Sequence, residues 1–188
     1  MNREYPSFQE IAEVDRKLSE MRTQYYIHHD LFSLQWWFLL CLLIVPWFIW
    51  WKLLDKSRAK EIMLYGASIS IIIVILDDLG GELHFWAYSY QLFRFLARLS
   101  PIDYSVLPVC HMLIFQYFRS WKSFFWANLI FGLGAAFIAE PFFVWIKIYK
   151  MYTWRYIYSV PLYVIKAMAV KGVLEFIQNM AKKRVKET

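Results

Sequence analysis

Four acidic residues at the ends of apolar stretches are the side chains of this sequence best placed to do chemistry. Asp77 and Asp78 follow one apolar stretch, and Asp103 opens the next. Glu140 lies a few residues before the end of another stretch. A carboxylate in hydrocarbon costs about 2.5–3.5 kcal/mol on insertion scales. Acids at such positions are expected to be paired, solvated or used in a reaction, so we take these four as candidate catalytic residues.

Basic and aromatic side chains are expected near these acids. His111 lies eight residues into the stretch that Asp103 opens, about 12 Å deeper in a helix. Lys166 lies ten residues into the last apolar stretch, where it could pair with an acid. The neighbouring aromatic residues are either an interfacial belt or a π-rich wall for a cation or an isoprenoid chain. The candidate substrate-binding residues are Trp86, Tyr88, Tyr104, His111, Trp145 and Lys166.

Two interpretations of the acids remain open. A carboxyl group that burial keeps protonated near neutral pH can act as a general acid. Intramembrane ionisable groups are functional sites by default, which favours a pocket that uses one or two of them. The alternative is structural, with acids paired to Lys166, His111 or Arg155 so that they hold the helices together.

The composition indicates that membrane-spanning helices position these residues. The chain is 60% hydrophobic, whereas about 45–50% is usual for soluble domains. A soluble fold of 188 residues has too little interior for 10 Trp, 13 Tyr and 16 Phe. The net charge of +6 comes from basic residues spread between apolar blocks, which suits anionic lipid headgroups better than nucleic acid. We therefore predict a multi-pass protein of the cell membrane, with the lipid bilayer as partner and no nucleic acid.

The apolar stretches predict an all-α integral membrane bundle of about five transmembrane helices. The second stretch has only fifteen uncharged residues, roughly 22 Å of helix against about 30 Å of hydrocarbon. Crossing would then draw Asp77 and Asp78 into the membrane, and Gly80-Gly81 is expected to break the helix. The second span ends, the third begins and the fourth ends on one membrane face, so the four acids share one depth zone. The expected spans are residues 33–51, 62–76, 102–118, 123–146 and 156–177.

The remaining segments complete the predicted organisation. Residues 7–30 carry apolar side chains at three- and four-residue intervals, which predicts an amphipathic helix within an N-terminal segment 1–32. Residues 82–99 are too polar for a span and predict an interfacial or re-entrant segment. The bundle is expected over residues 33–178, with a basic C-terminal tail at 179–188.

Common soluble-enzyme motifs are absent from the sequence. It contains no Walker loop, dinucleotide fingerprint, nucleophile elbow or metalloprotease helix. His28-His29-Asp30 resembles a metal cluster, but adjacent histidines on a helix point apart and no matching Cys/His set exists. The sequence therefore predicts no cofactor and no metal site.

Three motifs carry a resemblance to a known family. They are Asp77–Gly80 with Trp86–Tyr88, Pro101-Ile102-Asp103-Tyr104 with Pro108, and Gln116-Tyr117-Phe118. With a Trp-rich first span and a Glu-Pro/Trp region ending at Trp154, residues 35–178 resemble a family of small multi-pass membrane proteins common in spore-forming bacteria. That resemblance implies a multi-pass membrane fold and no particular activity.

A more distant likeness is to integral-membrane carotenoid and terpene cyclases of the lycopene-cyclase type. Pro101-Ile102-Asp103 is similar to their Pro-x-acid motif at the mouth of a span, although Tyr104 stands where those enzymes have a second acid. This likeness implies a membrane enzyme that starts cyclisation or isomerisation of an isoprenoid, or another lipid-soluble substrate, by protonation. The other function class is a non-catalytic membrane protein for ligand binding, sensing or transport assistance.

Overall fold

The chain folds mainly into helices, as its apolar pattern predicts. The structure is a computed structural model that describes residues 5–96 and 99–187, and 79% of the chain is helical. This confirms the all-α prediction. The helices are α1 (Phe8–Tyr25), α2 (Leu34–Leu53), α3 (Ala59–Glu82), α4 (Leu107–Tyr117), α5 (Trp121–Gly134), α6 (Glu140–Trp145) and α7 (Tyr156–Glu187).

Short turns of other helical types interrupt or join these helices. Three are π-helical, with hydrogen bonds that skip one more residue than in an α-helix. A 3₁₀ turn, η2 (Lys56–Arg58), leads into α3. The π turns are η1 (Tyr26–Asp30) after α1, η3 (Ile102–Val106) before α4, and η4 (Ala135–Ala139) between α5 and α6.

Three helical stretches in the described part of the chain are long and apolar enough to cross a membrane. Large apolar side chains such as Phe48, Ile71 and Ile130 are exposed on their outer faces, an arrangement that lipid accepts and water opposes. The eleven residues of α4 are too few for such a stretch, and α7 carries Lys166 and Lys171 in its apolar half. The three stretches are Leu34–Leu53, Lys56–Glu82 and Trp121–Trp145.

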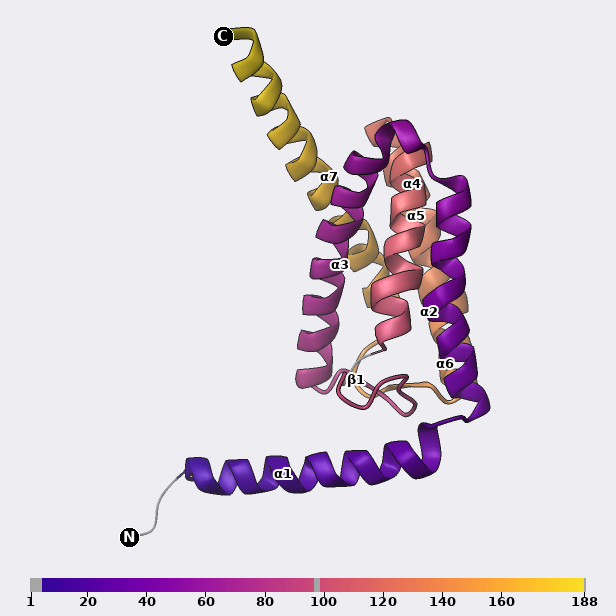
Figure 1. The fold of residues 1–188 in the computed structure, drawn as a ribbon, viewed down its shortest axis with the longest axis vertical. Helices are drawn as coiled ribbons and strands as arrows, with labels where there is room; N and C mark the ends of the chain where they lie inside the picture. Colours follow the sequence, from indigo (N-terminus) through magenta and orange to yellow (C-terminus); the bar gives the residue numbers. More distant parts are fainter. Residues whose placement is uncertain (1–4, 97–98, 188) are drawn as a thin grey trace.

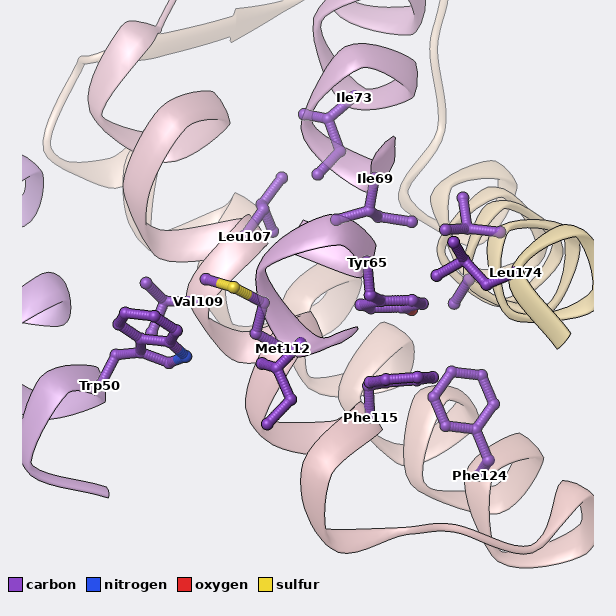
Figure 2. Packing of buried hydrophobic residues seen from close by; sticks show 13 residues of the cluster. Trp50, Tyr65, Ile69, Ile73, Leu107, Val109, Met112, Phe115, Phe124 and Leu174 are labelled. Carbon is purple, nitrogen blue, oxygen red and sulfur yellow. The ribbon is translucent and has the colours of Figure 1, made fainter. Parts of the chain in front are cut away.

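The core lies where α3, α4, α5 and α7 meet. The ring of Tyr65 stacks on Phe115 at 4.2 Å between centroids, and Phe124 meets both rings edge-on (Figure 2). A Cβ at Gly66 would lie 2.3 Å from the sulfur of Met112, so the missing side chain lets α3 approach α4 closely. Seven of the eleven residues of α4 are buried, which makes it the most enclosed helix of the bundle.

Two connecting segments close the end of the bundle where α3 ends and α4 begins. We call residues 83–96 and 146–155 the lid. Its two parts are joined by antiparallel pairing of β1 (Trp86–Tyr88) with β2 (Tyr149–Met151), in which Tyr88 faces Tyr149. The sequence predicted neither strand, because three residues are too few to show a period of two.

Helix α1 lies crosswise beyond the lid end of the bundle (Figure 1). None of its residues is buried, and a capping box between Ser7 and Glu10 begins it. A helix thus occupies most of the segment for which the sequence predicts an amphipathic helix. The turn that follows is fixed to the lid, because the backbone N–H of Gln91 donates to Asp30 at 3.1 Å and the Tyr26 hydroxyl donates to the Leu92 carbonyl at 2.9 Å.

Two helices extend beyond the ends expected from the apolar stretches. Helix α3 continues past the expected end at residue 76, and Gly80-Gly81 does not break it. With 24 residues it is about 36 Å long, so the expected shortfall in length does not arise. Helix α7 likewise runs past residue 178 to Glu187, so residues 179–187 are helical. In Figure 1 this last part of α7 projects away from the bundle.

Candidate functional site

A cavity of about 400 Å³ lies inside the bundle beneath the lid. Three of the four candidate acids line it, together with Lys166. The volume is near the lower end of the roughly 300–1,000 Å³ typical of small-molecule pockets. Most of the wall is apolar, formed by Ile73, Leu76, Leu99, Ile102, Val106, Leu107, Phe131, Gly134, Ala135, Ala139, Phe143 and Leu162.

Four different elements bring the charged groups together. Asp77 comes from the last turns of α3, Asp103 from η3, Glu140 from the start of α6, and Lys166 from α7. The convergence of Asp77, Asp103 and Glu140 follows the shared depth expected from the sequence. Whether these residues act in catalysis stays a prediction.

Two π turns shape the cavity wall. Residues Ile102, Asp103 and Val106 of η3, and Ala135 and Ala139 of η4, all line it. A π turn contains one residue more than an α-helical turn and often marks a functional site. Asp103 lies within η3, and Glu140 directly follows η4, so the extra residue of each turn affects the direction of these side chains.

Asp77 is held by the lid. Its Oδ1 accepts a hydrogen bond from Trp86 Nε1 at 2.9 Å and another from the hydroxyl of Tyr88. Gly80, one turn further along α3, provides the space for the indole, since a Cβ there would lie 2.0 Å from Trp86 Cζ2. The Asp-x-x-Gly and Trp-x-Tyr motifs are therefore one structural unit that fastens β1 to α3.

The lid tyrosines remain protonated. Burial, reinforced by the nearby Asp77 carboxylate, raises the pKa of Tyr88 well above its ordinary value. Burial also raises the pKa of Tyr149, whose ring stacks on Tyr88 at 5.6 Å between centroids. Both tyrosines line the cavity, and the one hydroxyl proton of Tyr88 is donated to Asp77.

Glu140 offers a carboxyl oxygen to the cavity. Its Oε2 is buried and has no hydrogen-bond partner among the residues that the structure describes. The hydroxyl groups of Ser159 and Tyr163 on α7 lie within hydrogen-bonding reach of the carboxyl group. Ser159 in turn accepts a hydrogen bond from Trp154 Nε1 at 3.0 Å. This oxygen can therefore accept a hydrogen bond from, or give a proton to, a molecule in the cavity.

Lys166 is buried in the wall of the cavity, with 8% of its surface exposed. Its Nζ lies over the ring of Tyr163, 4.4 Å from the centroid. The carboxyl groups that act on it electrostatically are those of Asp103, Glu140 and Asp77. The described lining thus combines three carboxyl groups, one amine and an aromatic wall.

The structure places the other predicted site residues differently. Trp86 and Tyr88 line the cavity, as expected, but Asp78, Tyr104 and Trp145 do not. Asp78 and Tyr104 follow cavity residues directly, and one step along an α-helix turns a side chain by about 100°. Trp145 is 77% exposed on the outer surface of α6.

His111 is fully buried in the core and does not line the cavity. Its Nδ1 lies 3.1 Å from Asn128 Oδ1, while Asn128 Nδ2 donates to the Phe124 carbonyl at 2.8 Å. The amide orientation makes Nδ1 the protonated nitrogen, and Nε2 has no partner among the described residues. We interpret His111 as a structural group that joins α4 to α5.

Sequence reasoning missed Tyr149, Ser159 and Tyr163. The last two could have been found, because Ser159, Tyr163 and Lys166 follow one another at four and three residues and so share a helix face. Tyr149 reaches the cavity only through the pairing of β2 with β1, which the sequence does not indicate.

Comparison with protein-family models, with curated proteins and with solved structures finds no match for this chain.

Proposed function

We propose that the chain is a multi-pass protein of the cell membrane that holds a small lipid-soluble molecule in the cavity beneath its lid. Five crossings are proposed: α2, α3, η3 with α4, α5 with α6, and the first half of α7. Three helical stretches with exposed apolar faces support membrane insertion. Helix α4 can cross without an apolar outer surface because most of it is buried among the other helices. Helix α7 can cross because its two lysines, Lys166 and Lys171, are buried in the protein and do not contact lipid.

The cavity is the observation that carries the ligand proposal. Its apolar wall suits a hydrocarbon body, and its polar groups lie where a headgroup or a reacting bond would be oriented. An isoprenoid is the ligand class that fits an apolar cavity with aromatic faces. The bilayer supplies such molecules directly.

An enzymatic role would use Glu140 as the acid. Its buried, available Oε2 could protonate an alkene or a polarised oxygen of the ligand. The rings of Tyr163 and Trp86 line the same space and would stabilise a carbocation. Asp77 is unsuited to that role because two lid donors already occupy one of its oxygens.

A non-catalytic ligand-binding role is the second candidate. The hydrogen bonds from Trp86 and Tyr88 to Asp77 favour this role, because they use an acid of the cavity to hold the lid. In this case the ligand would be bound and released unchanged.

Ligand occupancy can be tested with a cavity-filling variant. A Cβ at Gly134 meets no atom within 4 Å, and Gly134 lines the cavity, so Gly134→Phe should fill the space without distorting the backbone. Leu133→Phe is the matched control, since Leu133 is exposed on the next position of the same helix. Lipid extracted from purified wild-type protein and the control should contain a specific apolar molecule that Gly134→Phe lacks. Identical lipid content in all three proteins would refute the proposal.

Catalysis is tested separately by Asp103→Asn and Glu140→Gln. An acid catalyst should lose turnover of the bound lipid while its melting temperature changes little. If the acids only stabilise the bundle, loss of a buried partner should lower stability by about 3–5 kcal/mol with no lipid conversion even in the wild type.

A further inference from the structure

Lys166 and Lys171 are both buried in α7 but have different surroundings. Lys171 Nζ donates to the Arg119 carbonyl at 2.6 Å and lies 3.8 Å from Glu175, outside the cavity. Lys166 lines the cavity, and its Nζ lies over the Tyr163 ring, 4.4 Å from the centroid. Lys171 is thus fixed by protein groups outside the cavity, whereas Lys166 is part of the cavity wall.

The surroundings of Lys166 are those of a carbonyl-reactive amine. A lysine amine that is desolvated in an apolar site and close to proton-accepting groups is a nucleophile toward carbonyl carbon. Glu140 shares the cavity and has an available oxygen. The apolar wall would hold the hydrocarbon part of a ligand with its reactive end near the amine.

We propose that Lys166 binds a lipid-soluble aldehyde covalently, as a protonated imine. This inference rests on the proposed function, because it takes the cavity to be the ligand site and specifies the reactive group of the ligand. An aldehyde of isoprenoid type combines the apolar body that the wall accommodates with the carbonyl carbon that the amine requires.

The reaction balances without an oxidant or a reductant. The Lys166 ammonium passes one proton through water in the cavity to the Glu140 carboxylate. The neutral amine then forms a C–N bond to the carbonyl carbon, the electron pair of the C=O π bond moves to oxygen, and a proton passes from nitrogen to oxygen. Glu140 returns its proton to the resulting hydroxyl group, the C–O bond breaks, and water leaves. The product is a protonated imine.

The cavity would stabilise this product. The positive charge of the imine takes the place of the lysine ammonium, so the carboxyl groups of Asp103 and Glu140 remain its counter-charges. The Tyr163 ring lies under the same nitrogen and favours a cation at its face.

Reductive trapping tests the proposal. Purified protein in detergent is incubated with stoichiometric citral, reduced with sodium cyanoborohydride, and mapped by peptide mass spectrometry. Lys166 should carry one adduct and should react about 10²-fold faster than surface lysines, with Glu140→Gln slowing the reaction. Lys166→Arg should abolish the fast adduct, and Lys171→Arg, the matched control, should retain it.

Two outcomes would overturn the inference. One is equal labelling of Lys166 and the surface lysines in the wild type, a result that does not depend on any variant folding. The other is an undiminished fast adduct in Lys166→Arg or Lys166→Met. Geraniol, the alcohol with the same carbon skeleton as citral, cannot form an imine and therefore tests ligand binding alone. It separates failure of this inference from failure of the proposed function. Geraniol that binds the wild type but not Gly134→Phe, without any Lys166 adduct from citral, leaves the ligand cavity standing and removes the imine.

Discussion

Replacing Gly80 by Ala should detach the lid from α3. The new Cβ would lie 2.0 Å from Trp86 Cζ2, whereas ordinary contacts begin at 3.4 Å. The indole would therefore have to move by about 1.4 Å. A shift of this size breaks the 2.9 Å hydrogen bond from Trp86 Nε1 to Asp77.

Three terms set the expected size of the effect. Overpacking costs about 1–3 kcal/mol, and loss of a hydrogen bond to a charged acceptor costs about 1.5–3 kcal/mol. Helix propensity opposes them, because Ala is better than Gly by about 0.8–1.0 kcal/mol in a helix interior. The net loss of unfolding free energy should be about 1.5–5 kcal/mol.

The assay is unfolding by SDS titration in mixed micelles, combined with hydrogen exchange of residues 83–96. Gly134→Ala is the matched control: Gly134 is also helical, but a Cβ there meets nothing within 4 Å, so stability should stay the same or rise by up to about 1 kcal/mol. In a Trp86→Ala background the Gly80 substitution should lose its destabilising effect. Equal effects of the two glycine substitutions, or an unchanged loss in that background, would refute the reasoning.

Three further predictions concern other buried polar groups. Asn128→Leu should lower the free energy of unfolding by about 1–3 kcal/mol because the His111 N–H loses its acceptor. An unchanged SDS unfolding curve would contradict this prediction. Lys171→Met should lower stability by about 1.5–3 kcal/mol through loss of the charged donor to the Arg119 carbonyl, measured the same way, without affecting labelling of the cavity by citral. Burial raises the pKa of Asp30 above its ordinary 3.8, so the folded state binds the proton more tightly. The stability of wild type relative to Asp30→Asn should therefore rise as pH falls through the folded pKa and level off below about 3.8; a difference that is constant with pH would contradict this.

The sequence predicted the helices and the meeting of the acids, but the details of the site depend on long-range contacts. Apolar length identified the helical stretches, and chain order placed Asp77, Asp103 and Glu140 at one end of the bundle. It could not show that Asp77 is fixed by β1, because that contact depends on Gly80 accommodating an indole from the following segment. The same glycine was expected to end α3, since glycine is an ordinary helix breaker when nothing packs against it.

The π turns were also invisible to the sequence analysis, and they decide which acids reach the cavity. Glu140 directly follows η4, and Asp103 lies within η3. Removing the extra residue of η4 would turn every following side chain of α6 by about 100° relative to α5. Glu140 would then leave the cavity wall, and an outward-facing residue of α6 would replace it. The presence of the Glu140 carboxyl group in the same cavity as a buried amine thus depends on a local irregularity of the helix. For this reason composition and periodicity predicted the bundle more completely than its site.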